Sequence, residues 1–216
     1  MPFSTINQEL AGQKEVDTAE FEDPIADKTE WTSLAGIGAS FCTHKLVSTG
    51  SKRIEFRVSI GARLLFLTLS LLGLTATTAF ISKWGVKGTE SFATDRGLII
   101  LGLLFTSVGS VMYYLLSAPI VFDKPVGFFW RGRKSPERVS DISTIKHLAQ
   151  LDAVHALQLV SSRWSNEGGA WRVYEVNLVL RNGKRLHVVG HGDVDQIRND
   201  AEILSEFLDV PLWDAI

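Results

Sequence analysis

The chain has 216 residues, a net charge of −2 and a single cysteine, Cys42. One cysteine excludes an intrachain disulfide, and a nearly neutral chain is a poor fit for nucleic-acid binding, which needs a strongly basic surface. The first 30 residues contain eight acidic residues and two lysines. We therefore expect residues 1–37 to form a disordered acidic tail.

Residues 38–60 predict the first part of a β-domain. Ala39–Val47 and Arg53–Ser59 are rich in β-branched and aromatic residues, and apolar and charged side chains alternate in the second segment. This alternation is typical of a strand with one buried face. Residues 48–51, which include Gly50, are expected to form the turn of a hairpin.

Two uncharged stretches follow, Leu64–Ser82 with 19 residues and Gly97–Phe122 with 26. A bilayer core about 30 Å thick requires roughly 20 helical residues, so residues 61–118 predict a transmembrane hairpin. Transporters usually place charged residues within their spans. Because neither stretch contains one, conduction through a single copy is not expected.

Lysine and arginine residues flank the hairpin unevenly. Five precede the first stretch, three lie in the connecting loop and five follow the second stretch. Basic residues favour the cytoplasmic side, so both termini are expected to be cytoplasmic. No apolar run precedes the first stretch, so we expect no cleavable signal peptide, and a single cysteine suits a reducing compartment. We therefore expect a multi-pass protein of a bacterial inner membrane.

Small residues recur one helical turn apart within the two apolar stretches. Such residues let membrane helices approach each other closely. Packing of the two stretches against each other is the favoured interpretation, and the seam of a homo-oligomer is the alternative. The small residues are Gly73, Thr77, Gly102, Thr106 and Ser110.

The chain after the hairpin predicts about five further strands. Ile120–Asp123 and Gly127–Arg131 form the first pair, and a short helix is expected near Ser143–Gln150. Ala156–Val160 predicts the next strand. Trp171–Arg181 is the clearest strand, because its apolar and polar residues alternate apart from two valines.

A tight turn connects this clearest strand to the last one. A two-residue turn would place apolar residues on both faces of the strand pair. A three-residue turn, with Gly183 in the left-handed conformation of a G1 bulge, keeps one apolar face. It pairs Leu178 with Leu186 and Val176 with Val188, and we favour this register.

An amphipathic helix is expected near the end of the chain. Asp193 followed by Gln196 fits a capping box at its start, and Pro211 lies just beyond its end. Apolar residues at helical spacing define its buried face. They are Ile197, Ala201, Leu204 and Leu208.

Strands followed by a C-terminal helix suggest an α+β membrane protein. Its transmembrane hairpin is inserted in a pleckstrin-homology-like antiparallel β-domain, which comprises residues 38–60 and 119–216. In the stretches FDKPVGFFWRGR (Phe122–Arg133) and DAEILSEFLDVPLWD (Asp200–Asp214), the chain resembles bacterial two-helix membrane proteins with such a domain. Its layout is also similar to the photosystem I assembly factor family. The resemblance implies a membrane-tethered binding or assembly module without catalysis, and nothing in the sequence points to photosynthesis.

The sequence contains no motif typical of an enzyme, a metal site or a cofactor site. Gly190-His191-Gly192 lies between a strand and a helix, as in a dinucleotide loop, but Asp193 and Asp195 would repel a phosphate there. His187, His191 and Asp193 have no regular ligand spacing, so no metal is expected. We therefore expect a protein that is not an enzyme and has no cofactor.

The expected function is to bind a protein partner through the cytoplasmic domain and so assemble or regulate a membrane complex. An immunity protein against a toxin and a sensor of anionic membrane lipids are the alternatives. Aromatic and basic residues after the second stretch suit the headgroup level of a bilayer, and plain anchoring is the favoured explanation for them. The candidates for partner or lipid binding are Trp130, Arg131, Arg133, Lys134, Trp164, Trp171 and His187.

Overall fold

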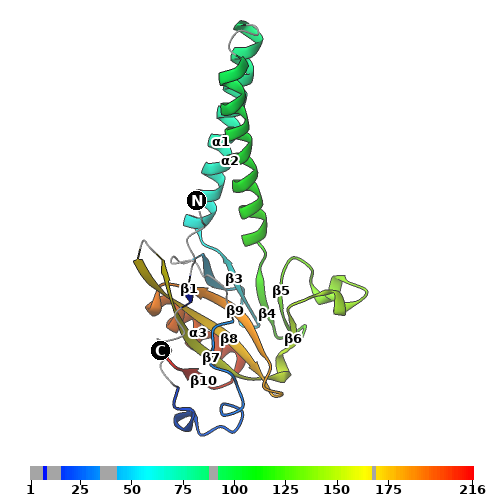
Figure 1. Cartoon of the computed structure of the whole chain (residues 1–216). Helices are drawn as coiled ribbons and strands as arrows, with labels where there is room; N and C mark the ends of the chain where they lie inside the picture. Colours follow the sequence, from blue (N-terminus) through cyan, green and yellow to red (C-terminus); the bar gives the residue numbers. More distant parts are fainter. Residues whose placement is uncertain (1–6, 9–15, 35–42, 88–91, 167–168) are drawn as a thin grey trace. The chain divides into compact units, whose positions relative to one another are not determined.

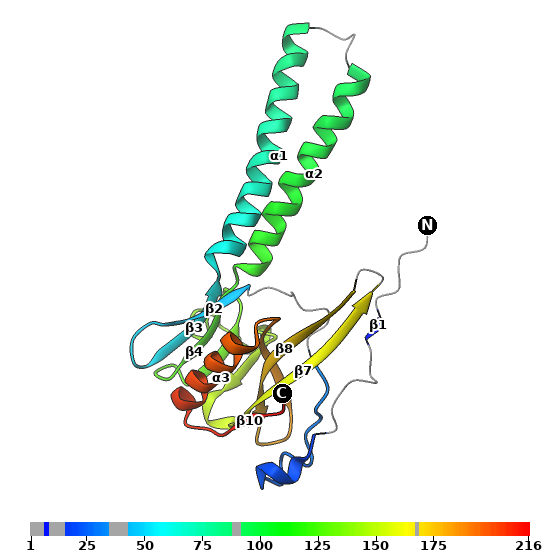
Figure 2. The same ribbon diagram turned by 90° about the vertical axis from the view of Figure 1, so that its left-hand side faces the viewer.

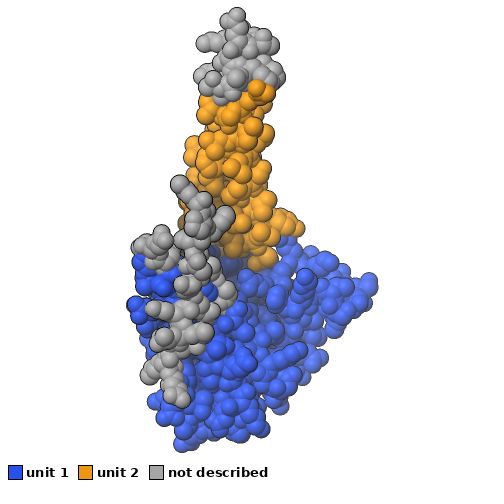
Figure 3. Space-filling model, in the orientation of Figure 1, with its two compact units in different colours: residues 1–57, 119–216 blue, residues 58–118 orange. Residues whose placement is uncertain are grey.

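The protein is α+β and divides into two compact units, coloured separately in Figure 3. One unit comprises residues 1–57 and 119–216, and the other comprises residues 58–118. Part of the expected strand Ala39–Val47, and part of the expected acidic tail, lie outside the described residues. The computed structural model describes residues 7–8, 16–34, 43–87, 92–166 and 169–216.

Residues 58–118 form a pair of long helices. Helix α1 spans Ile60–Lys87 and helix α2 spans Phe92–Leu116. Within them, Ile60–Ser82 and Arg96–Leu116 are long and apolar enough to cross a membrane, each with a mean hydropathy of 2.0. Large apolar side chains are exposed along both helices. This exposure distinguishes them from the buried core helices of soluble proteins.

The two helices pack closely where both carry small residues. A Cβ atom added to Gly73 would lie 2.5 Å from the carbonyl oxygen of Gly102 and 2.5 Å from the amide nitrogen of Thr106. A Cβ atom added to Gly102 would meet the hydroxyl of Thr77, and the Ser110 hydroxyl lies 3.3 Å from a serine hydroxyl on α1. All five small residues identified in the sequence therefore lie at the contact between α1 and α2 of one chain.

The first sheet of the other unit is antiparallel, and its strands follow the chain order. Strands β3 and β4 pair directly, with Arg53 opposite Asp123 and Phe56 opposite Ile120. The hairpin of α1 and α2 is thus inserted between two neighbouring strands. The strands are β2 (His44–Ser48), β3 (Arg53–Val58), β4 (Ile120–Asp123), β5 (Phe128–Arg131) and β6 (Leu148–Gln150).

The second sheet is built on one long hairpin, formed by β7 and β8 (Figures 1 and 2). Strand β9 pairs with β8, while β1 (antiparallel) and β10 (parallel) both pair with β7. The parallel β10 follows the C-terminal helix and was not expected from the sequence. The strands are β1 (Asn7–Gln8), β7 (Val154–Asn166), β8 (Gly169–Leu180), β9 (Arg185–His191) and β10 (Leu212–Asp214).

Helix α3, Val194–Leu208, packs its apolar face on the core that both sheets share. Asp193 accepts a hydrogen bond from the amide of Gln196, as the capping motif predicts. The reciprocal half of the expected capping box is absent, because the Asp193 amide donates to His191 Nδ1 at 3.2 Å. The Gln196 side chain donates to Asp200 at 2.8 Å. Fully buried core residues come from all three layers. They include Phe56, Phe122, Phe129, Leu157, Leu178, Ile197 and Leu204.

The turn between β8 and β9 agrees with the expected three-residue type. Gly183 has a φ of 78°, and Leu178 lies opposite Leu186. The expected pairing of Val176 with Val188 is wrong, because Val176 lies opposite Val189. A bulge in β9 adds one residue at this point, and it leaves both Val188 and Val189 buried in the core.

The short helix expected near Ser143–Gln150 is also wrong. Residues Leu148–Gln150 form β6, where Ala149 lies opposite Phe129 and the backbone obtains its hydrogen bonds from the neighbouring strand. Two short 3-10 helices lie between β5 and β6. The 3-10 helices are Thr18–Phe21, Pro136–Arg138, Ile142–Thr144 and Leu151–Ala153.

Candidate partner-binding surface

One face of the second sheet packs on the core, and its opposite face, called here the outer face, is also buried. Residues of β7 and β8 that share the outer face lie opposite each other, and all except Trp171 are buried. Val173 and Val179, the two valines that break the alternation of β8, belong to this face. Apolar residues on both faces are typical of a strand that is covered on both sides. The opposing residues are Ala156 and Val179, Gln158 and Asn177, Val160 and Glu175, Ser162 and Val173, and Trp164 and Trp171.

Residues 16–34, called here the strap, lie against the outer face. The rings of Phe21 and Trp31 stack at a centroid distance of 5.1 Å, and each lies 5.9 Å from the ring of Trp213 on β10. Ala26 is fully buried in the same cluster. The expectation of a disordered tail is therefore wrong for residues 16–34, because Phe21, Ile25, Ala26 and Trp31 pack in a cluster on the sheet.

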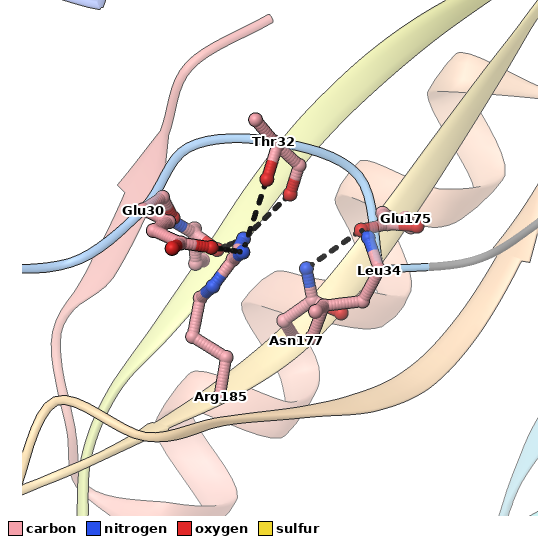
Figure 4. A network of polar contacts seen from close by, with 7 residues as sticks. Glu30, Thr32, Leu34, Glu175, Asn177 and Arg185 are labelled. Carbon is pink, nitrogen blue, oxygen red and sulfur yellow. Dashed lines mark hydrogen bonds and ion pairs between the residues drawn. The ribbon is translucent and has the colours of Figure 1, made fainter.

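The polar part of the strap is bound through its main chain (Figure 4). The Gln158 amide donates to the carbonyl oxygen of Glu30 at 3.0 Å, and Arg185 Nη1 donates to the carbonyl oxygen of Thr32 at 2.6 Å. The backbone amide of Leu34 donates to Glu175 Oε1 at 2.6 Å. Between residues 30 and 34, side chains of the sheet thus contact the main chain at every second residue, the period of an extended chain.

Glu175 and Arg185 are charged residues that lie almost entirely out of solvent. The Glu175 residue is 1 % exposed, and it also accepts hydrogen bonds from the Ser33 hydroxyl and the Asn177 side chain, each at 2.8 Å. The Arg185 side chain is 4 % exposed and lies 3.2 Å from the carboxylate of Glu30. Burial lowers the pKa of Arg185 from its usual value, while Glu30 and Glu175 raise it. A buried charge requires such partners, so the network depends on the strap.

A second polar contact joins the strap to β7. Asp23 Oδ2 lies 2.6 Å from His155 Nε2. Burial raises the pKa of Asp23, but hydrogen bonds from the Ile25 amide and from His155 outweigh it and hold that pKa below its usual value. The carboxylate form of Asp23 is thus favoured while the strap is bound.

His187, expected to be exposed, is largely buried beside the same network. Its Nδ1 atom lies 3.9 Å from Glu175 Oε2 and has no hydrogen-bond partner among the described residues. Burial lowers the pKa of His187 to about 4, although Glu175 raises it. The imidazole is therefore neutral at pH 7, and it is not an exposed binding residue.

Two tryptophans among the expected surface residues are buried. Trp130 is 3 % exposed, packs in a cluster with Val121 and Ile145, and has the Arg53 guanidinium 5.6 Å from its ring centroid. Trp164 is 7 % exposed. Neither residue can be part of an accessible surface, because both are buried.

The remaining expected residues differ in exposure. Arg133 and Lys134 are exposed, whereas Arg131 and Trp171 are partly buried. Burial lowers the pKa of Arg131. Arg131 lies close enough to His187 for its charge to lower the pKa of that histidine. Sequence reasoning missed the network of Glu175 and Arg185.

No cluster of three or more histidine, cysteine, aspartate or glutamate residues suited to a metal ion occurs in the part of the chain that the structure describes. Comparisons with protein-family models, with curated proteins and with solved structures found no match. The chemistry of the site is therefore argued from its own residues.

Proposed function

We propose that this chain is a membrane-anchored, non-enzymatic protein whose β-domain binds a protein partner and so assembles or regulates a membrane complex. The insertion of the hairpin between paired strands carries this proposal. Strand β3 ends at Val58 and α1 begins at Ile60, while α2 ends at Leu116 and β4 begins at Ile120. Two such short links join two neighbouring strands of the β-domain to the apolar helices.

The finer assignment is a pleckstrin-homology-like domain at a bacterial inner membrane, with both termini in the cytoplasm. Two antiparallel sheets around one core, followed by helix α3, support the domain assignment. The excess of basic residues on both sides of the hairpin supports the orientation. The binding role is supported by the outer face, where buried polar side chains contact the main chain of another segment.

Membrane insertion and orientation are tested by cysteine labelling in bacterial cells, with Cys42→Ser as background. Thr89→Cys in the loop between the helices should react with an impermeant maleimide in intact spheroplasts. Lys184→Cys, in the turn before β9, should react only after the inner membrane is opened. Release of the chain by alkaline carbonate, or the reverse labelling pattern, would contradict the proposal.

Partner binding is tested by affinity purification from detergent-solubilised membranes. The full chain is compared with a tagged segment of residues 58–118, which retains the helices and lacks the β-domain. A protein that co-purifies with the full chain alone is expected. The binding role is refuted if the same proteins, or none, are recovered with both.

Sensing of anionic lipids is a second candidate, supported by the exposed side chains of Arg133 and Lys134 shortly after β5. The protein is reconstituted in nanodiscs, and binding of anionic vesicles is compared with binding of neutral vesicles. Preference for anionic vesicles should fall in Arg133→Ala/Lys134→Ala. Indifference to lipid charge removes this candidate.

A further inference from the structure

The second sheet binds residues 30–34 of the strap in part through groups that every peptide chain has. Gln158 and Arg185 donate to the carbonyl oxygens of residues 30 and 32, and Glu175 accepts from the amide of residue 34. These groups do not depend on the strap's side chains. Any extended segment that lies along the same path can make the same three hydrogen bonds.

Two further contacts favour particular side chains in the bound segment. The Trp31 ring packs on Phe21 and Trp213, so an aromatic residue is favoured between the first two main-chain contacts. The Arg185 guanidinium lies 3.2 Å from the Glu30 carboxylate, whose side chain is 81 % exposed. The Arg185 guanidinium is therefore complementary in charge to an acidic residue at this position of the bound segment.

The face under the strap is suited to being uncovered. Its central side chains, Gln158, Glu175 and Arg185, are polar and can bind water if the strap leaves. By contrast, the core on the other side of the sheet contains only apolar groups at its centre, such as Phe56, Phe122 and Leu178. Release of the strap therefore exposes much less apolar surface than unfolding of the β-domain does.

We propose that the outer face of β7, β8 and β9 is a docking surface for an extended, acidic segment of a partner protein that carries an aromatic residue. The strap occupies this surface within the same chain, and the partner's segment replaces it. This assignment rests on the proposed partner-binding function and names the surface and the chemistry that the partner presents. Because the strap is tethered, its effective concentration is on the order of millimolar, so a weakly binding segment cannot displace it.

The test uses the full chain in detergent and a fluorescent peptide of residues 24–34, with sequence PIADKTEWTSL, as the probe. Phe21→Ala/Trp31→Ala loosens the chain's own strap by removing two of the three stacked rings. The peptide should bind this variant at least tenfold more tightly than the wild-type chain. A peptide of the same composition in scrambled order should not bind.

The contribution of the sheet is tested in the loosened chain. Arg185→Ala should weaken peptide binding at least tenfold, because it removes the donor to the Thr32 carbonyl. Lys184→Ala is the matched control, since Lys184 is an exposed basic residue next in sequence. Equal binding to wild-type and loosened chains, equal effects of the two alanine variants, or a dimer that exchanges straps would overturn the proposal.

Hydrogen exchange of the wild-type chain gives an answer even if the loosened variant does not fold. The amides of residues 30–34 should exchange at least tenfold faster than those in the centres of β7 and β8. If both sets exchange at the same rate, the strap opens only when the domain unfolds, and the docking surface is refuted. None of these measurements requires the partner or a membrane, so their failure leaves the results on membrane insertion and co-purification intact.

Discussion

Gly73→Ala adds one methyl group at the contact between α1 and α2. The new Cβ atom would lie 2.5 Å from the Gly102 carbonyl oxygen and 2.5 Å from the Thr106 amide nitrogen, whereas ordinary contacts begin at 3.4 Å. Both neighbours are backbone atoms, which no side-chain rotation can move away. The helices must therefore separate by about 0.9 Å at this point, the difference between the two distances.

The expected destabilisation of the hairpin follows from two opposing effects. Overpacking of this kind typically costs about 1–3 kcal/mol, and separation also weakens the hydrogen bond between the hydroxyls of Ser70 and Ser110, which are 3.3 Å apart. Alanine in place of glycine favours a helix by up to about 1 kcal/mol. The net destabilisation is about 1–2 kcal/mol, which corresponds to roughly a 5- to 30-fold change in the equilibrium between packed and separated helices.

Disulfide formation measures this equilibrium directly. The pair Ser70→Cys/Ser110→Cys, in the Cys42→Ser background, should form a disulfide readily in membranes. Addition of Gly73→Ala should slow the reaction at least fivefold. Gly97→Ala is the matched control, because a Cβ atom there has nothing within 4 Å. If both glycine substitutions give the same rate as the parent pair, the close packing of α1 and α2 is refuted.

Three further substitutions have defined outcomes. Trp130→Ala should lower the free energy of unfolding of the β-domain by about 3 kcal/mol or more, because it empties a packed cluster; thermal melting should show no such loss for the exposed Lys134→Ala. Asp193→Ala should cost about 1 kcal/mol by loss of the α3 cap, and a melting temperature no lower than that of Asp195→Ala would contradict this. The pKa of Asp23 is lowered in the folded protein. The Asp23 carboxylate therefore stabilises the bound strap above pH 3.8, and this stabilisation is lost as the pH falls below 3.8. The near-ultraviolet dichroism of the stacked rings should therefore differ between wild type and Asp23→Asn at pH 5, and a difference that persists well below pH 3.8 would contradict the role of this carboxylate.

The sequence was most informative where structure depends on neighbours along the chain. The lengths of the two apolar stretches identified both long helices. The alternation in Arg53–Ser59 identified β3, and Asp193 and Pro211 marked the two ends of α3. Small residues at helical spacing also identified the contact between α1 and α2. Helical periodicity and capping are local properties, so short windows of sequence contain the necessary information.

Expectations about burial were less successful. Trp130 and Trp164 were both expected at the surface, Trp130 because aromatic side chains next to basic ones are typical of membrane interfaces. Both are buried, and Trp130 packs in a cluster with Val121 and Ile145. The register of β9 was likewise wrong by one residue beyond Leu178, since the bulge that buries both Val188 and Val189 depends on the core and not on the turn.

By itself the sequence determined the two apolar helices, most of the strands and the terminal helix, because each depends on residues close together in the chain. Only the tertiary structure showed that the strap covers the second sheet. The hydrogen bonds that hold it join residues that are far apart in the chain. Gln158 and Glu30 are 128 positions apart, and Arg185 and Glu30 are 155 positions apart. Pairing over such distances leaves no periodic pattern in the strap itself, where acidic composition alone suggests disorder. Its one trace in the sequence was the pair of valines, Val173 and Val179, on the supposedly solvent-facing side of β8.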